Sequence, residues 1–92
     1  MQDNKIGMHC FISGRVQGVW YRASAQKEAN VLGVTGWVRN VSDGRVEVVA
    51  YGEKEKVRQF YAWLQRGPTL AKVTAVSEEE ITWQAHAHFE VK

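Results

Sequence analysis

Residues 8–13 alternate between apolar and more polar positions, with Met8, Cys10 and Ile12 on one face. This period of two predicts a half-buried strand. Two glycines in the residues that follow interrupt the pattern. From residue 22 to 32, apolar residues recur at i, i+4 and i+7, which predicts an amphipathic helix. A glycine directly after this segment is suited to end the helix.

The second half of the chain predicts a hairpin, another helix and two further strands. Residues 34–41 and 45–52 have strand character, and the Ser-Asp-Gly turn between them predicts an antiparallel hairpin. An apolar stripe predicts a helix over residues 54–65, which ends at a Gly-Pro pair. Strands are also predicted over residues 72–79 and 88–92.

The order of these elements predicts the class of fold. Strand, helix, strand, strand, helix and strand follow one another, with room for one short additional strand. This order is typical of a split β-α-β sandwich of the α/β (α+β) class, in which two helices cover one face of a mainly antiparallel sheet. Residues 1–7 are polar and are expected to form a flexible tail, so residues 8–92 are expected to form a single domain.

Composition limits the classes of function. A chain of 92 residues suffices for one domain, and a formal net charge of +2 permits an anionic ligand without the basic excess of a dedicated nucleic-acid binder. Its one cysteine excludes an intramolecular disulfide. No apolar run approaches the roughly 20 residues of a membrane span, and the N-terminus lacks the apolar core of a secretory signal. We therefore expect a cytoplasmic monomer with neither membrane nor nucleic acid as a partner.

The stretch GRVQGVWYR, residues 14–22, joins the first strand to the first helix and contains no Asp, Glu, His or Cys. Gly14 and Gly18 allow its backbone N–H groups to face one point, and the helix N-terminus adds the positive end of its dipole. Arg22 adds a planar fork for two phosphate oxygens. Neither GK[ST] nor G-x-G-x-x-G occurs, so neither ATP nor a dinucleotide is implied. Spacing alone leaves two interpretations open, an anion site and a turn that binds nothing.

Four stretches together resemble the acylphosphatase family. They are GRVQGVWYR at 14–22, LGVTGWVRN at 32–40, DGRVEVVAYG at 43–52 and GPTLAKV at 67–73. Their order and spacing match that family over about residues 10–76. The resemblance implies a ferredoxin-like α/β sandwich that hydrolyses small-molecule acyl phosphates to a carboxylate and inorganic phosphate. It also leads us to expect no cofactor and no metal.

The resemblance also implies a role for particular residues. In the family, the loop after the first strand holds the phosphate with backbone amides. Here that loop comprises Arg15, Val16, Gln17, Gly18, Val19 and Trp20. The arginine that closes the motif binds the phosphate oxygens, which implies this role for Arg22. The asparagine that ends GWVRN holds the attacking water, which implies this role for Asn40. Trp20 and Tyr21 stand where phenylalanine is more usual in the family.

Other chemically capable residues have simpler interpretations. His86 and His88 form an H-x-H pattern, but without a third ligand nearby they are expected to be exposed histidines on a strand. Cys10 alternates with apolar neighbours and is expected to be a buried small hydrophobe. Arg39 and Arg45 flank the hairpin turn, and we expect solvated edge charges with a local Asp partner.

Three alternatives remain open at the level of the sequence. The order of elements is also that of an RNA-recognition motif, although RVEVVAY, residues 45–51, has only one of the aromatics such a module needs. The same motifs resemble the domain of a larger maturation factor that binds carbamoyl phosphate. A catalytically idle anion-binding domain is the third alternative, which the presence of both Arg22 and Asn40 disfavours.

Overall fold

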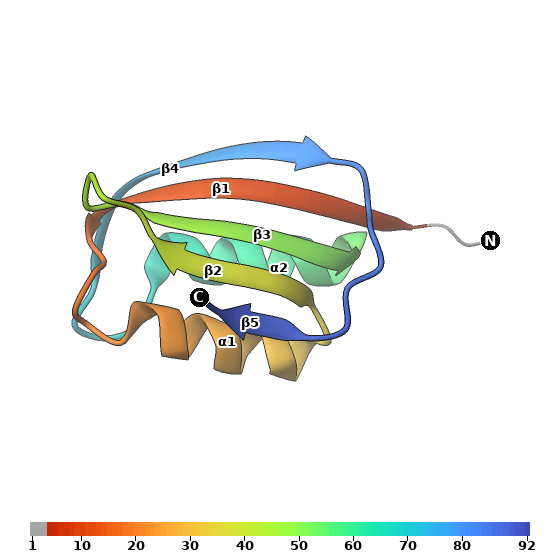
Figure 1. Cartoon of the computed structure of the whole chain (residues 1–92), viewed down its shortest axis with the longest axis horizontal. Helices are drawn as coiled ribbons and strands as arrows, with labels where there is room; N and C mark the ends of the chain where they lie inside the picture. The colour runs from red at the N-terminus through yellow and green to blue at the C-terminus, as the bar shows by residue number, and fades with distance from the viewer. Residues whose placement is uncertain (1–3) are drawn as a thin grey trace.

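The computed structural model describes residues 4–92 and contains one five-stranded sheet and two helices (Figure 1). The elements are β1 (Lys5–Arg15), α1 (Tyr21–Leu32), β2 (Thr35–Asn40), β3 (Val46–Glu53), α2 (Lys54–Arg66), β4 (Lys72–Ile81) and β5 (Phe89–Val91). All the predicted strands and helices are present, with boundaries that differ by a few residues.

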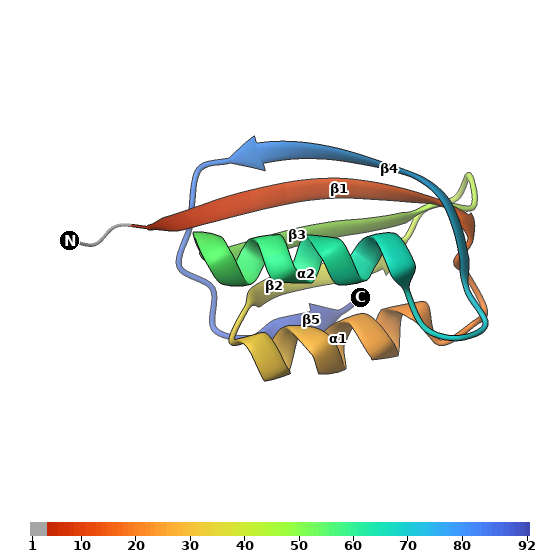
Figure 2. The ribbon, with the colours of Figure 1, turned by 180° about the vertical axis from the view of Figure 1, so that it is seen from behind.

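The strands lie in the order β4-β1-β3-β2-β5, and both helices cover the same face of the sheet (Figures 1 and 2). The pairs β1·β4, β1·β3 and β2·β3 are antiparallel, whereas β5 pairs in parallel with β2. This is the expected ferredoxin-like arrangement. The short additional strand is β5, which forms the edge of the sheet beside β2.

Strand β1 begins earlier than its hydrophobic alternation indicates. It starts at Lys5 rather than Met8, so residues 5–7 belong to the sheet and not to the expected tail. The cause is pairing on both sides, because Gly7 lies opposite Tyr51 of β3 and Ile81 of β4. Residues 1–3 of the expected tail lie outside the described residues.

The core fills the space between the sheet and the two helices. Its buried members include Met8, Cys10 and Ile12 from β1, Val46, Val48 and Ala50 from β3, and Ala25, Ala29, Val57, Phe60 and Leu64 from the helices. Burial of one Val, Leu or Phe side chain contributes about 1.5–3 kcal/mol. Cys10 is confirmed as a buried small hydrophobe, and burial raises the pKa of its thiol to about 12. Within residues 4–92, no helix is long and apolar enough to cross a membrane.

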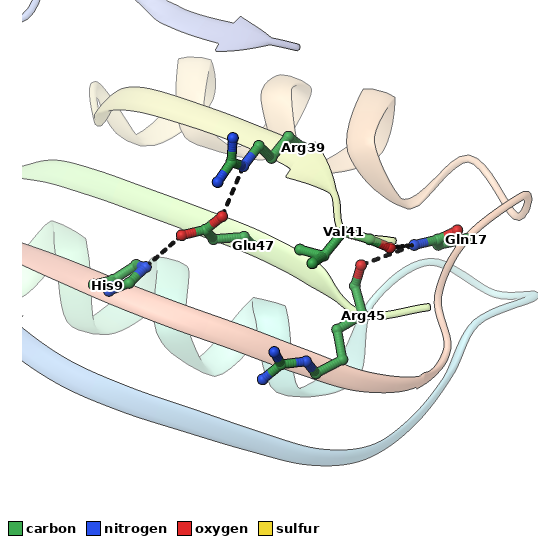
Figure 3. A network of polar contacts seen from close by, with 6 residues as sticks. All are labelled: His9, Gln17, Arg39, Val41, Arg45 and Glu47. Carbon is green, nitrogen blue, oxygen red and sulfur yellow. Dashed lines mark hydrogen bonds and ion pairs between the residues drawn. The ribbon is translucent and has the colours of Figure 1, made fainter. Parts of the chain in front are cut away.

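The opposite face of the sheet carries a polar network centred on Glu47 of β3 (Figure 3). One carboxylate oxygen lies 2.7 Å from His9 Nε2, and the other accepts a hydrogen bond of 2.7 Å from Arg39 Nε. Burial by itself raises the pKa of Glu47, but the hydrogen bonds from His9 and Arg39 outweigh it and hold this pKa below its ordinary value. Three neighbouring strands are thereby joined by one buried carboxylate.

Aromatic rings on the same open face are covered by cations. The Arg45 guanidinium lies 4.2 Å from the centre of the Phe11 ring, and Lys92 Nζ lies 4.6 Å from that of Trp37. An RNA-recognition motif stacks bases on such rings. Here both rings already have cationic partners.

Replacing Glu47 with glutamine is expected to destabilise the protein near neutral pH and to matter less in acid. A carboxylate with a lowered pKa contributes stability above the ordinary glutamate value of about 4.3, and the contribution is lost as the pH falls through the lowered value. At about pH 7, Glu47→Gln should lower the free energy of unfolding by about 1–3 kcal/mol, measured by urea denaturation.

Glu80→Gln is a matched control, because Glu80 is an exposed glutamate of β4. This substitution should change the free energy of unfolding by no more than about 0.5 kcal/mol. Equal losses in the two variants near neutral pH would contradict a stabilising role for Glu47. A deficit of Glu47→Gln that persists unchanged to about pH 3 would contradict it as well.

Candidate active site

The chain turns sharply between β1 and α1 with the help of two glycines, Gly14 near the end of β1 and Gly18 in the loop of residues 16–20, here called the glycine loop. Gly14 has φ of 121°, and a Cβ at this position would collide with the Lys72 carbonyl oxygen of β4. The pairing of β1 with β4 shifts register between Ser13 and Gly14, which bends the end of β1. Gly18 has φ of 75°, in the left-handed region that glycine enters without strain. The loop therefore curls back toward the start of α1.

The N-terminus of α1 is suited to an anion. Among residues 4–92, no side chain caps this end, and the first turn of α1 contains no acidic residue. The first backbone N–H groups of a helix have no partner within the helix, and the helix dipole is positive there. Both features favour a negatively charged ligand at this end.

Five of the predicted site residues line one cavity of about 360 Å³. They are Val16, Gly18, Trp20, Arg22 and Asn40, and the other lining residues are Tyr21, Ala23 and Val91. Arg22 lies at the start of α1 and Asn40 at the end of β2. The structure thus brings together the two side chains for which the resemblance implies the chemistry.

The other three predicted residues lie around this cavity without lining it. Arg15 ends β1 opposite Lys72, and the Val19 side chain is buried in the core. Gln17 points toward the β2–β3 hairpin, as described next. The phosphate-binding role of their backbone N–H groups stays a prediction.

Gln17 ties the loop to the hairpin that carries Asn40 (Figure 3). Its side-chain Nε2 donates hydrogen bonds to the Val41 carbonyl at 2.8 Å and to the Arg45 carbonyl at 2.9 Å. Val41 directly follows Asn40, so Gln17 links the glycine loop to the end of β2. The sequence motif contains Gln17 but does not reveal that its side chain acts across the site.

The end of the chain contacts Arg22. The Arg22 guanidinium donates a hydrogen bond of 2.8 Å from Nη1 to the main-chain oxygen of Lys92. Lys92 is held there because its own N–H donates to Val38 of β2 at 2.9 Å. Sequence reasoning missed Val91 and Lys92 as site residues, because their position depends on the parallel pairing of β5 with β2.

The two hairpin arginines have different partners. Arg45 Nε lies 2.9 Å from Asp43 Oδ2, so Arg45 has the expected local Asp partner. Arg45 donates hydrogen bonds to this carboxylate, the most important one from its backbone N–H, and they lower the pKa of Asp43. The expectation was wrong for Arg39, whose partner is the buried Glu47. Because Arg39 lies opposite Glu47 on paired strands, the two side chains share the open face. Arg22 is the one charged side chain among the lining residues of the cavity.

His86 and His88 precede β5 and are not on a strand, which corrects the prediction for this segment. Pairing with β2 begins only at Phe89. The carbonyl of the preceding residue, His88, accepts a hydrogen bond from the Gly36 N–H of β2. His88 Nε2 lies 3.2 Å from a carboxylate oxygen of Glu90. Within residues 4–92, no three His, Cys, Asp or Glu side chains are placed to hold a metal ion.

Trp20 adopts a backbone conformation that is rare for a large residue. Its φ of 65° lies in the left-handed region, which costs a non-glycine residue roughly 1–2 kcal/mol. The side chain is 77% exposed, so its burial does not offset this cost. Sequence reasoning gave Trp20 only a backbone role.

Comparison with known proteins reveals relatives over nearly the whole chain. The acylphosphatase family model matches residues 8–91. An acylphosphatase of Legionella pneumophila (strain Corby) is 52% identical over 87 residues, which cover 95% of this chain and 96% of the relative. The structure of an acylphosphatase from Coxiella burnetii has a TM-score of 0.92 at 43% identity and covers 97% of this chain and 94% of its own. That of the Bacillus subtilis acylphosphatase has a TM-score of 0.91 at 34% identity, covering 95% and 98%.

Gln17→Ala is expected to loosen the loop and to lower stability. Two hydrogen bonds are lost, which should reduce the free energy of unfolding by about 1–3 kcal/mol in urea denaturation, while both carbonyls keep a backbone N–H donor in the turn. Gln84→Ala, at an exposed position between β4 and β5, should have almost no effect. If both variants were as stable as the parent, the link between loop and hairpin would not matter energetically.

Proposed function

The chain belongs to the acylphosphatase family, and on this premise we propose that it hydrolyses the carboxyl–phosphate bond of acyl phosphates to a carboxylate and inorganic phosphate. The observation that carries the proposal is the shared cavity of Arg22 and Asn40 beside the glycine loop and the N-terminus of α1. The parts of the site come from separate segments of one chain, so the scheme needs no second subunit.

Phosphate binding is assigned to Arg22 and to the backbone N–H groups of the loop from Arg15 to Trp20. A guanidinium matches two phosphate oxygens with parallel hydrogen bonds. One such charge-assisted hydrogen bond contributes about 1.5–3 kcal/mol net. The hydrogen bond from Nη1 to the main-chain oxygen of Lys92 holds the Arg22 guanidinium in place, which reduces the conformational freedom lost on binding.

Asn40 is assigned to the attacking water. Its amide can both accept from and donate to a water, but it is too weakly basic to remove a proton. In the proposed reaction, the water oxygen forms a bond to phosphorus on the side opposite the acyl oxygen. The bond between phosphorus and the acyl oxygen breaks, and the carboxylate leaves with the electron pair. The proton lost by the water passes to solvent.

The small number of polar side chains in the cavity agrees with this chemistry. A carboxylate is stable at neutral pH, so the leaving group does not need a proton from a general acid. Phosphoryl transfer depends mainly on positioning and on stabilising charge on the phosphoryl oxygens. Arg22 and the N–H groups supply the charge stabilisation, and Asn40 supplies the positioning. The scheme therefore requires no metal ion and no cofactor.

Two alanine variants should separate these roles. With benzoyl phosphate as substrate, Arg22→Ala should mainly raise KM and Asn40→Ala should mainly lower kcat. Removal of one group that stabilises the transition state costs on the order of 3–4 kcal/mol of barrier, or a factor of about 100–1,000. A metal chelator should leave the rate of the parent unchanged.

Absence of turnover by the parent protein would refute the enzymatic proposal. Turnover of Asn40→Ala at the parental rate would remove Asn40 from the mechanism. Gln84→Ala, at an exposed position away from the cavity lining, should retain the parental rate and serves as the control.

The rate should also vary little with pH between about pH 5 and about pH 8. Arginine stays protonated and asparagine does not titrate in this range, so neither proposed residue changes its charge. Initial rates with benzoyl phosphate across the range test this expectation. A bell-shaped profile would indicate a titrating acid and base that the two-residue scheme lacks.

A further inference from the structure

We propose that the indole of Trp20 binds the acyl group of the substrate and thereby contributes to the choice among acyl phosphates. This inference rests on the proposed function, because it concerns the other half of the same substrate. Phosphate binding and water positioning use the polar residues of the cavity. They assign nothing to the side chain of Trp20.

The fold itself does not explain Trp20. Among residues 4–92 it is the one non-glycine residue with positive φ, and 77% of it is exposed. Glycine would adopt this backbone conformation without strain, and asparagine would do so more readily than tryptophan. A strained backbone combined with an exposed ring indicates a contribution outside folding.

The other tryptophans contact a cation or an aromatic ring of the protein itself. Each has a partner: Lys92 and Arg39 at Trp37, Phe60 and Tyr21 at Trp63, and Lys5 at Trp83. In the part of the chain that the structure describes, Trp20 has neither an aromatic nor a cationic partner. Its ring is therefore available to a ligand.

The position of Trp20 identifies this ligand. Trp20 lines the cavity of Arg22 and Asn40, and so does Val91 of β5, which is 40% exposed. The cavity thus combines polar groups for a phosphate with an exposed apolar rim. An acyl phosphate is divided in the same way, into a charged phosphate and an uncharged acyl group. With the phosphate at Arg22, the acyl group lies against the indole, where a flat apolar group gains most from stacking.

Substrate selectivity tests the assignment. The parent should have a higher kcat/KM for benzoyl phosphate than for acetyl phosphate. Trp20→Asn tolerates the left-handed backbone and lacks the ring, so it should reduce this ratio by about threefold to tenfold, mainly through the KM for benzoyl phosphate. Trp20→Phe keeps a ring and should hold the ratio closer to that of the parent. Val31→Asn, at another exposed apolar residue, should not change it.

Inhibition by inorganic phosphate distinguishes loss of the acyl contact from distortion of the loop. Its inhibition constant should be similar in the parent and in Trp20→Asn, because phosphate occupies only the polar half of the cavity. An unchanged ratio in Trp20→Asn, an equal loss in Trp20→Phe, or a parallel weakening of phosphate inhibition would overturn the assignment. Hydrolysis of neither substrate by the parent would instead overturn the proposed function, and the acyl assignment with it.

Discussion

Tyr21 fixes the start of α1, and the geometry of the cavity depends on that position. Its side chain is almost fully buried, and its hydroxyl donates a hydrogen bond of 2.6 Å to the carbonyl of Leu64 near the end of α2. Burial raises the pKa of this hydroxyl, so it remains a donor. The residues on either side, Trp20 and Arg22, both line the cavity. One buried aromatic therefore sets where the helix begins and where its two neighbours lie.

The cavity is assembled from segments that are distant in the sequence and joined by hydrogen bonds to main-chain oxygens. Gln17 donates to carbonyls of the β2–β3 hairpin, and Arg22 donates to Lys92 after β5. Peptide carbonyls do not titrate, so the link from Gln17 to the hairpin does not depend on the protonation of its acceptors. The site is thus held by contacts that leave the proposed chemistry to Arg22, Asn40 and the loop.

Several features followed from local patterns and were confirmed by the structure. Helices α1 and α2 lie where apolar residues recur with the helical period, and the hairpin lies where a Ser-Asp-Gly turn separates two strands. The roles of Arg22 and Asn40 were assigned through resemblance to a family and stay predictions; both residues line one cavity. Arg39 was misjudged because its partner, Glu47, lies on the neighbouring strand rather than in the turn.

The sequence by itself determined the local conformations and the core-facing side of each element, and it singled out residues 14–22 as the stretch for which the resemblance implies phosphate binding. Periodicity, turn chemistry and glycine positions are encoded within short segments, and these properties can be read without knowing which segments meet. Only the tertiary structure decided that β5 pairs in parallel with β2 and that Lys92 reaches Arg22. It also decided that Gln17 spans the site and that Trp20 stays exposed at the cavity. Such contacts depend on strand order and register across the whole sheet, which residues close in sequence do not specify.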